Sequence, residues 1–302
     1  MIDCTLVTCE EVPTLDPDDR LLVDELHERG RTVSISAWSD PRVDWAASRL
    51  CILRSTWDYH RRHREFTAWM WQAASLTTIR NDPRLVSWNA HKSYLRDLEC
   101  LGVPIVPTAW VRRGEKRALT DLSDAHGWRD LVLKPARGAA AHDVTLVRRD
   151  SASFAAGQAR LDKLVRTGDV LVQPYLEAVV SYGERALVFF HGRYSHAVVK
   201  KPFDRVLVVG DMPSLAVEAT SEEIDVASKT LAAVGGRPLY ARIDLLRDTD
   251  ANVCVSEVEL IEPGLYLAVH EPARADFADA IERELEADRG EFPVVSCEET
   301  VR

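Results

Sequence analysis

Apolar and polar positions alternate most regularly in the stretch 239–264, which predicts two antiparallel strands joined by a turn rich in Asp and Asn. Arg242 and Asp244 share one face of the first strand. Glu257 and Glu259 share one face of the second. A turn centred midway between the two strands sets Asp244 opposite Glu257. The same register sets Arg242 opposite Glu259.

Two carboxylates that face each other across a strand pair destabilise a sheet unless a cation lies between them. Oxygen ligands of this kind suit a hard ion such as Mg²⁺, which also binds substrate phosphates. The alternative is a solvated polar face with an Arg to Glu bridge. The hairpin alone does not decide between these two interpretations.

The first hundred residues alternate short β-rich runs with helical patterns. Strands are expected at 5–9, 32–38 and 50–57, and helices at 17–29, 61–74 and 89–102. This order predicts βαβ units around a largely parallel sheet, with ligands at the carboxyl ends of the strands. In the third helix Asn89 is the expected N-cap, and Lys92 then lies in the first turn. A lysine there is either solvated or directed at a bound anion.

Two strand ends in this region carry side chains that suit a small polar substrate. The first is Cys9 with Glu10, and the second is the run RSTWDYH at 54–60. The candidate substrate residues of the second run are Ser55, Thr56, Asp58 and Tyr59. The alternative for this run is a turn around a buried Trp57.

A second unit is expected from 108 to 177. The apolar strand 131–135 carries Lys134, and a loop of small residues at 137–143 precedes another strand at 144–147. Small residues let backbone N–H groups approach a phosphate, and Lys134 would supply charge. The chain has neither a GxxxxGK[ST] loop nor a GxGxxG fingerprint, so this loop by itself is weak evidence. His142 in the loop is either a proton carrier or an exposed side chain.

The remaining chain predicts a second hairpin at 184–202 around a turn at 191–193, a helix at 221–234 opened by Ser221, and a last helix after Glu271. We expect the last helix to be a solvated outer helix, because it is heavily charged. The fold class is therefore α/β (α+β), in three domains: 1–107, 108–177 and 178–302.

The composition of the chain argues against several classes of protein. The 302 residues carry a net charge of −10 and 46% hydrophobic residues, which argues against a general nucleic-acid binder. Six cysteines without a CxxC pair fit reduced thiols in a cytoplasm, and they disfavour a zinc or redox protein. No run approaches the roughly 18 apolar residues of a membrane span. We expect a soluble, cytoplasmic protein; the sequence does not indicate its oligomeric state.

Several of these residues form an ordered set. Along the chain stand Lys92, Lys134, QPYLE at 173–177, Arg185, Asp244, Glu257 and a PG pair. The set resembles the ATP-grasp superfamily of ligases over nearly the whole chain. The resemblance implies an ATP-grasp fold with a small lid domain, ATP and Mg²⁺ as cofactors, and a small amino-acid-like substrate that is activated as an acyl phosphate.

The resemblance also assigns roles. Lys92 and Lys134 would contact phosphates; Gln173, Pro174, Tyr175 and Leu176 would contact adenine; Glu184 and Arg185 would lie near ribose and phosphates. Asp244, Glu257 and Glu259 would hold magnesium, and Arg185, Arg242 and Lys134 would be catalytic. Glu259 replaces the usual asparagine, so it either ligates a second ion or pairs with Arg242. Glu262, just before the PG pair, is an additional departure from the family pattern.

Within the superfamily, RSTWDYH, WNAHKSYL and VLKPARGAAAHDV resemble the branch that closes O-ureido-D-serine to D-cycloserine, with release of CO₂ and NH₃. One alternative is a carboxylate–amine ligase that joins two small amino-acid substrates. Another is a non-catalytic ATP-binding regulator, which loss of Asp244 or Glu257 would favour, and both are present.

Overall fold

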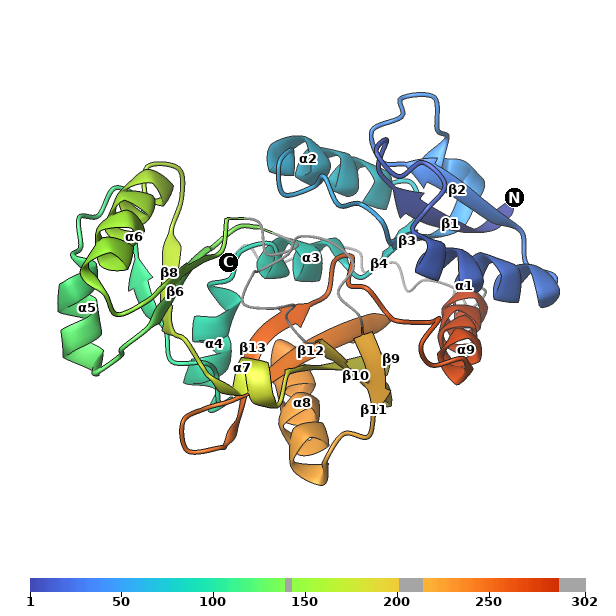
Figure 1. The fold of residues 1–302 in the computed structure, drawn as a ribbon. Helices are drawn as coiled ribbons and strands as arrows, with labels where there is room; N and C mark the ends of the chain where they lie inside the picture. Colours follow the sequence, from blue (N-terminus) through green and yellow to red (C-terminus); the bar gives the residue numbers. More distant parts are fainter. Residues whose placement is uncertain (139–142, 201–213, 288–302) are drawn as a thin grey trace, which may run out of the picture.

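The computed structural model describes residues 1–138, 143–200 and 214–287. Three sheets are arranged side by side (Figure 1): an N-terminal sheet, a central sheet, and a smaller sheet at the opposite end of the molecule. The expected mixed α/β class is confirmed. The predicted domain boundaries at 107 and 177 stay predictions, and packing crosses the first of them.

The N-terminal sheet is parallel, as expected, in the order β2-β1-β3-β4. Its elements in chain order are β1 Ile2–Thr8, α1 Pro17–Glu28, β2 Val33–Ala37, the short 3-10 helix η1 Trp45–Ala47, β3 Ser48–Leu53, α2 His63–Ala74 and β4 Thr78–Arg80. The helix α1 begins where Asp16 accepts a hydrogen bond from the N–H of Asp18 and proline occupies the first turn. The carboxyl ends of β1 and β3 bring Cys9 and the 54–60 run to the same edge.

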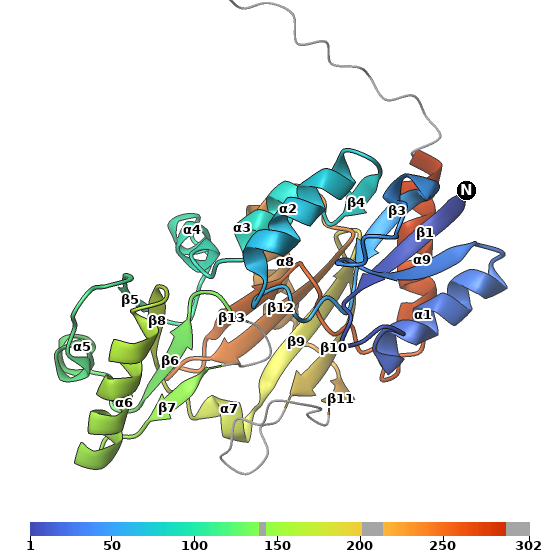
Figure 2. The same ribbon diagram turned by 90° about the horizontal axis from the view of Figure 1, so that it is seen from above.

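The small sheet is antiparallel, in the order β5-β8-β6-β7, with two helices on one face (Figure 2). Its elements are β5 Ala109–Val111, α5 Leu119–His126, β6 Leu131–Pro135, β7 Thr145–Val147, α6 Ser151–Leu164 and β8 Val170–Pro174. Apolar side chains of all four strands and both helices form one core. This sheet carries Lys134 at the end of β6.

The central sheet is antiparallel, in the order β11-β10-β9-β12-β13. Its elements are α7 Ala178–Ser181, β9 Glu184–Phe190, β10 Arg193–Lys200, β11 Ser214–Val217, α8 Ser221–Val234, β12 Tyr240–Arg247 and β13 Val253–Glu259. One face packs against α8. The predicted bounds of that helix are confirmed, but its N-cap is Thr220 and not Ser221: the Thr220 side chain accepts from the N–H of Glu223, and the Glu223 side chain accepts from the N–H of Thr220.

The carboxylate hairpin has the predicted register, but a bulge produces it. Asp244 pairs with Glu257, whereas Leu245 pairs with Val255, so Ser256 is one extra residue on β13. The turn itself is closed by the N–H of Asp248 donating to the carbonyl of residue 252 at 2.9 Å, half a residue away from the expected centre. Without the bulge, the two carboxylates would not face each other.

The segment before the small sheet differs from the prediction. Two short helices, α3 Pro83–Asn89 and α4 Tyr94–Cys100, replace one long helix, and Asp82 caps the first. Asn89 is therefore no N-cap: its side chain donates to the carbonyl of Val258 and accepts from the N–H of Leu260. Lys92 lies between the helices, not in a first turn. The bend at this point directs Lys92 toward β13.

The last helix, α9 Pro272–Ala287, corrects another expectation. Its charged residues face outward, but Phe277, Ile281 and Leu285 are buried in a core shared with the N-terminal sheet and α1. Figures 1 and 2 show α9 beside α1, although the two helices come from opposite ends of the sequence. The helix thus packs against both the N-terminal part and the central sheet. No helix that the structure describes is long and apolar enough to cross a bilayer.

We predict that Phe277→Ala lowers the free energy of unfolding by about 3–5 kcal/mol, because it removes a fully buried ring. Arg283→Ala, on the exposed face of the same helix, is the matched control and should change it by less than about 0.5 kcal/mol. Urea unfolding of the three proteins measures both values. Equal effects would mean that α9 is the solvated helix expected from its charge.

Candidate active site

A buried carboxylate on the first strand of the hairpin is held by two cations. Asp244 on β12 accepts from Nε of Arg242 at 2.9 Å and from Nζ of Lys200 at 2.6 Å. Burial alone would raise the pKa of Asp244, but Arg242 and Lys200 outweigh it and hold that pKa below its usual value. The carboxylate is therefore ionised at neutral pH, as a ligand of a metal cation must be.

The opposing carboxylate belongs to Glu257 on β13. It forms an ion pair with Lys92, whose Nζ also donates to the carbonyl of Gly138 at 3.3 Å. The backbone N–H of Lys92 donates to the carbonyl of Ala136 at 2.7 Å, which ties this lysine to the end of β6. Burial lowers the pKa of the Lys92 ammonium, and Glu257 more than reverses this effect. Lys92 therefore joins the small sheet to the central sheet at the carboxylates.

Lys134 is the unpaired cation of the site. It has no hydrogen bond or ion pair with the side chains of the described chain. Burial lowers the pKa of its ammonium, although Glu257 and Glu184 favour the charged form. Among the site lysines it is thus the one that gains most from an anionic ligand.

Lys200 is a site residue that the sequence analysis did not select. Its Nζ lies 2.6 Å from Asp244 and 2.8 Å from Glu184. The pairing of β10 with β9 sets Lys200 opposite Glu184, and a hairpin centred on Gly192 predicts this pair. The signal was therefore present in the sequence. Glu184 also accepts from the hydroxyl of Ser256, the bulge residue, at 2.6 Å.

Arg185, a predicted catalytic residue, lies on the opposite face of the sheet from the carboxylates. Neighbours on a strand point to opposite faces, so Glu184 faces Asp244 while Arg185 faces α8. Its guanidinium lies 4.2 Å from the centre of the Tyr182 ring, and its Nε is 3.9 Å from Glu223. The sheet separates it from the carboxylates, and its catalytic role stays a prediction.

The four predicted adenine contacts lie in the link from the small sheet to the central sheet. Gln173 is buried and donates to the hydroxyl of Thr108 at 2.9 Å, and Pro174 ends β8. Tyr175 lies under the guanidinium of Arg148, and Leu176 is buried in a small apolar cluster. Their role toward adenine stays a prediction.

Three of the predicted substrate residues are held by protein partners. Cys9 is buried in the core of the N-terminal sheet. Ser55 donates to Asp19 at 2.9 Å, and Asp58 accepts from the indole N–H of Trp38 at 2.7 Å. These side chains therefore have structural contacts within the protein. Their role toward a substrate stays a prediction. Glu10 is exposed and accepts from Ser39.

The other two substrate candidates, Thr56 and Tyr59, are also buried. Thr56 is buried, and its hydroxyl has no hydrogen-bond partner in the described residues. Burial raises the pKa of the Tyr59 phenol well above its usual value, and the negative charges of Glu262 and Glu257 add to this. Tyr59 therefore lies close to the carboxylates. Trp57 is 44% exposed, which contradicts the alternative of a turn built on a buried Trp57.

Two further carboxyls on the same segment have raised pKa values. Burial raises the pKa of Glu259 to about 7, although its ion pair with Arg242 opposes the shift. Burial likewise raises the pKa of Glu262 to about 8, with the charge of Glu259 next in size. Arg242 also donates to the carbonyl of Gly264 at 3.1 Å. The pairing of Glu259 with Arg242, one of the two expected alternatives, is present.

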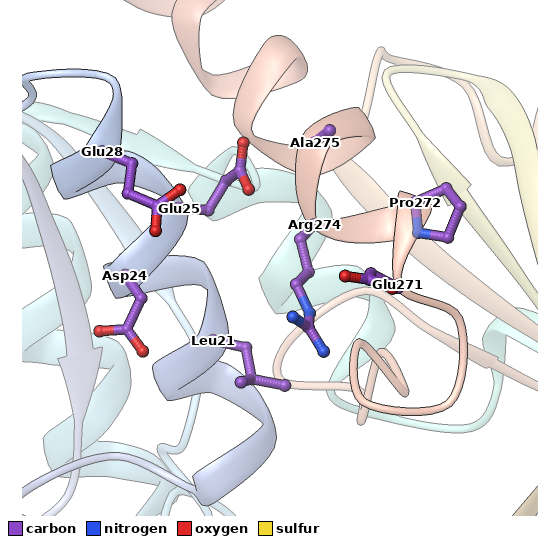
Figure 3. A pocket seen from close by; sticks show the side chains of 8 residues that line it. All are labelled: Leu21, Asp24, Glu25, Glu28, Glu271, Pro272, Arg274 and Ala275. Carbon is purple, nitrogen blue, oxygen red and sulfur yellow. The ribbon is translucent and has the colours of Figure 1, made fainter.

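Two surface cavities lie away from the carboxylate hairpin, and one of them, of about 470 Å³, is lined by Glu10 among others. A groove of about 530 Å³ between α1 and α9 (Figure 3) is lined by Leu21, Asp24, Glu25, Glu28, Glu271, Pro272, Arg274 and Ala275. Its charged lining is mainly acidic, and Glu25 in it is already paired with Arg29.

A search of the described chain finds no group of three His, Cys, Asp or Glu side chains arranged to hold a metal ion. His142 lies outside the described residues.

Comparison with known proteins identifies the family. Residues 4–81 match the family described as D-cycloserine synthetase DcsG, N-terminal domain. The cycloserine biosynthesis protein DcsG of Streptomyces lavendulae is 34% identical over 93% of this chain and 98% of that protein. The chain belongs to the D-cycloserine synthetase family. The crystal structure of D-cycloserine synthetase DcsG superimposes with a TM-score of 0.85 at 32% identity, covering 93% of this chain and 99% of that one.

More distant structures share only the fold of this D-cycloserine synthetase family member. The ATP complex of D-alanine–D-alanine ligase from Bacillus anthracis matches with a TM-score of 0.68 at 14% identity, over 95% of this chain and 98% of that one. The expected ATP-grasp fold and the expected enzyme class, an ATP-dependent ligase, are confirmed. The site residues remain predictions about individual roles.

We predict that Glu262→Gln changes how stability depends on pH. A folded-state pKa of about 8, against 4.5 for the ordinary group, means that the folded protein keeps a proton that the unfolded chain loses as pH rises between these values. Wild-type stability therefore falls over this window, and the variant lacks this contribution. Relative to wild type, the variant should gain on the order of 2 kcal/mol between pH 5 and pH 8.

Chemical unfolding at the two pH values measures this difference. Glu28→Gln, an exposed change of the same chemistry on α1, should leave the pH dependence as in wild type. If Glu262→Gln follows Glu28→Gln at both pH values, the carboxyl of Glu262 is ionised and solvated in the folded protein.

Proposed function

We propose that the protein is an ATP-dependent cyclo-ligase that closes O-ureido-D-serine to D-cycloserine, with release of CO₂ and NH₃. Family membership supports this substrate class. The observation that carries the chemistry is the meeting of Lys134, Lys92 and Lys200 with the carboxylates of Asp244 and Glu257 at one place. An arrangement of cations beside acidic oxygen ligands suits phosphoryl transfer from a magnesium nucleotide.

The lysines supply the positive charge. Lys134 reaches the site from the small sheet and has no competing partner, so we assign it to the transferred phosphate. Lys92 and Lys200 hold the carboxylates in place in the described structure, and each can turn its ammonium to a phosphate oxygen when ATP arrives. Lys92 and Lys200 each face a negative charge before and after this exchange, which keeps its cost low.

The donor set fits magnesium. Asp244 and Glu257 offer carboxylate oxygens from facing positions, with Glu259 next to them, and Mg²⁺ prefers such oxygens. When bound there, Mg²⁺ would neutralise negative charge on the phosphates. Lys92 and Arg242 keep the same carboxylates ionised until then.

Ring closure follows from the substrate's own groups. The substrate carboxylate displaces ADP from the γ-phosphorus and becomes an acyl phosphate. The ureido nitrogen bonded to oxygen attacks the acyl carbon, loses its proton, and expels phosphate. Water then removes the carbamoyl group as CO₂ and NH₃. Arg242, next to the carboxylates, is the described cation best suited to stabilise the oxyanion formed in the attack.

Turnover of a single substrate is the first prediction of this proposal. With ATP and Mg²⁺, O-ureido-D-serine alone should yield ADP and, by mass detection, D-cycloserine. Glu257→Gln should lower kcat by about 10³-fold or more, because it removes a charge that faces the metal and holds Lys92. Glu28→Gln is the control for the change of chemistry.

Two other outcomes would contradict the proposal. ADP formation only after a second amine is added would identify an intermolecular carboxylate–amine ligase. ATP binding without turnover of any small amino acid would favour a regulator that retained the fold.

Lys134→Met tests the assignment of the transferred phosphate. Loss of the unpaired ammonium should lower kcat/KM for ATP by about 10²-fold, which corresponds to roughly 3 kcal/mol. Folding should persist, since Lys134 has no ion pair in the described chain whose loss would leave a charge buried. Lys163→Met, on the distant helix α6, is the matched control. Equal kinetics of the two variants would remove Lys134 from the site.

A further inference from the structure

Glu262 lies in a link whose backbone is fixed on both sides by arginines. After β13, Nη2 of Arg54 donates to the carbonyl of Pro263 at 2.6 Å. Nη1 of Arg242 donates to the carbonyl of Gly264 at 3.1 Å. Charge-assisted bonds to consecutive carbonyls leave the link little freedom. The position of the Glu262 side chain is therefore set by the fold, as expected for a residue that must meet a ligand in one orientation.

The carboxyl of Glu262 has no partner of its own. Its Oε1 is buried and lacks a hydrogen bond within residues 1–138, 143–200 and 214–287. Of the two arginines that act on its charge, Arg242 binds Asp244 at 2.9 Å and Nη2 of Arg54 binds Asp19 at 2.8 Å, and neither donates to Glu262 in the described residues, although Nη1 of Arg54 has no hydrogen-bond partner there. A carboxyl oxygen that is buried without a donor is costly, and a donor supplied by a ligand is one way in which such an atom is satisfied.

Charge is distributed unevenly along the site. The lysines gather where the small sheet meets the hairpin, and Lys134 there still lacks an anion. At the other end Arg242 pairs with both Asp244 and Glu259, and Glu262 has no ion pair in the described residues. A ligand that matches both ends carries negative charge toward the small sheet and positive charge toward the N-terminal sheet.

We propose that Glu262 binds the α-ammonium group of the amino-acid substrate. This inference rests on the proposed function, since it names the contact that the substrate makes in that site. An α-ammonium is one carbon away from the carboxylate, so holding it at Glu262 brings the carboxylate to the side of Arg242 and the metal ligands. The negative charge of Glu262 contributes to the raised pKa of the Tyr59 phenol, which places the two side chains in one neighbourhood.

The experiment compares wild type, Glu262→Gln and Glu28→Gln, each with O-ureido-D-serine and with its analogue that lacks the α-amino group. Glu262→Gln keeps the shape and replaces the carboxyl with a group that cannot become negatively charged when an ammonium binds. It should raise KM for O-ureido-D-serine by about 10- to 100-fold and leave KM for ATP within about 2-fold. Wild type should prefer the aminated substrate by a similar factor, and this preference should vanish in the variant.

A structural role would give a different result. It would raise KM for both compounds and for ATP alike, and that outcome, or an unchanged KM, would overturn the inference. If wild type does not turn over O-ureido-D-serine, the proposed function fails by itself. Calorimetric titration of the ATP-loaded proteins with small D-amino acids and their desamino analogues then decides: affinity that depends on the amino group in wild type and not in Glu262→Gln supports the contact, and equal dependence in both overturns it.

Discussion

The site depends on compensation between buried charges at the carboxylate hairpin. Burying a carboxylate without a cation costs several kcal/mol, so the acids of β12 and β13 are tolerable only because cations reach them from other parts of the chain. Lys200 comes from β10, Arg242 from β12 itself, and Lys92 from the bend between α3 and α4. The bend, the order of strands and the capping of the short helices all serve to deliver these side chains.

The same compensation explains how the site can be assembled before any ligand is bound. Lysines and carboxylates already neutralise each other, so a magnesium nucleotide meets preorganised groups that only exchange partners. Lys134 and Glu262 differ from these groups, because neither has a side-chain partner within the residues that the structure describes. Together they define a direction along which a ligand with two different ends would lie.

Much of this arrangement follows from local pattern. Alternation set the face of β12, but the predicted pairing of Asp244 with Glu257 is present only because the bulge at Ser256 offsets a turn centred half a residue from the expected position. Alternation could not tell which of two adjacent charged residues, Glu184 or Arg185, faces the site, because that depends on a distant partner strand. The ligand-side lysine Lys200 was missed although its hairpin predicted it. The burial of α9 was also readable, since Phe277, Ile281 and Leu285 recur at helical spacing, but its charges concealed this stripe.

The extra residue at Ser256 has a consequence for comparing relatives. A hairpin whose turn is shorter or longer by one residue can keep both carboxylates on one face only if it also loses or gains a bulge. An alignment that places a gap in this turn without checking the parity of the strand will assign the acidic positions to the wrong face. Turn length and bulge should therefore be treated as one inherited unit when members of the family are aligned.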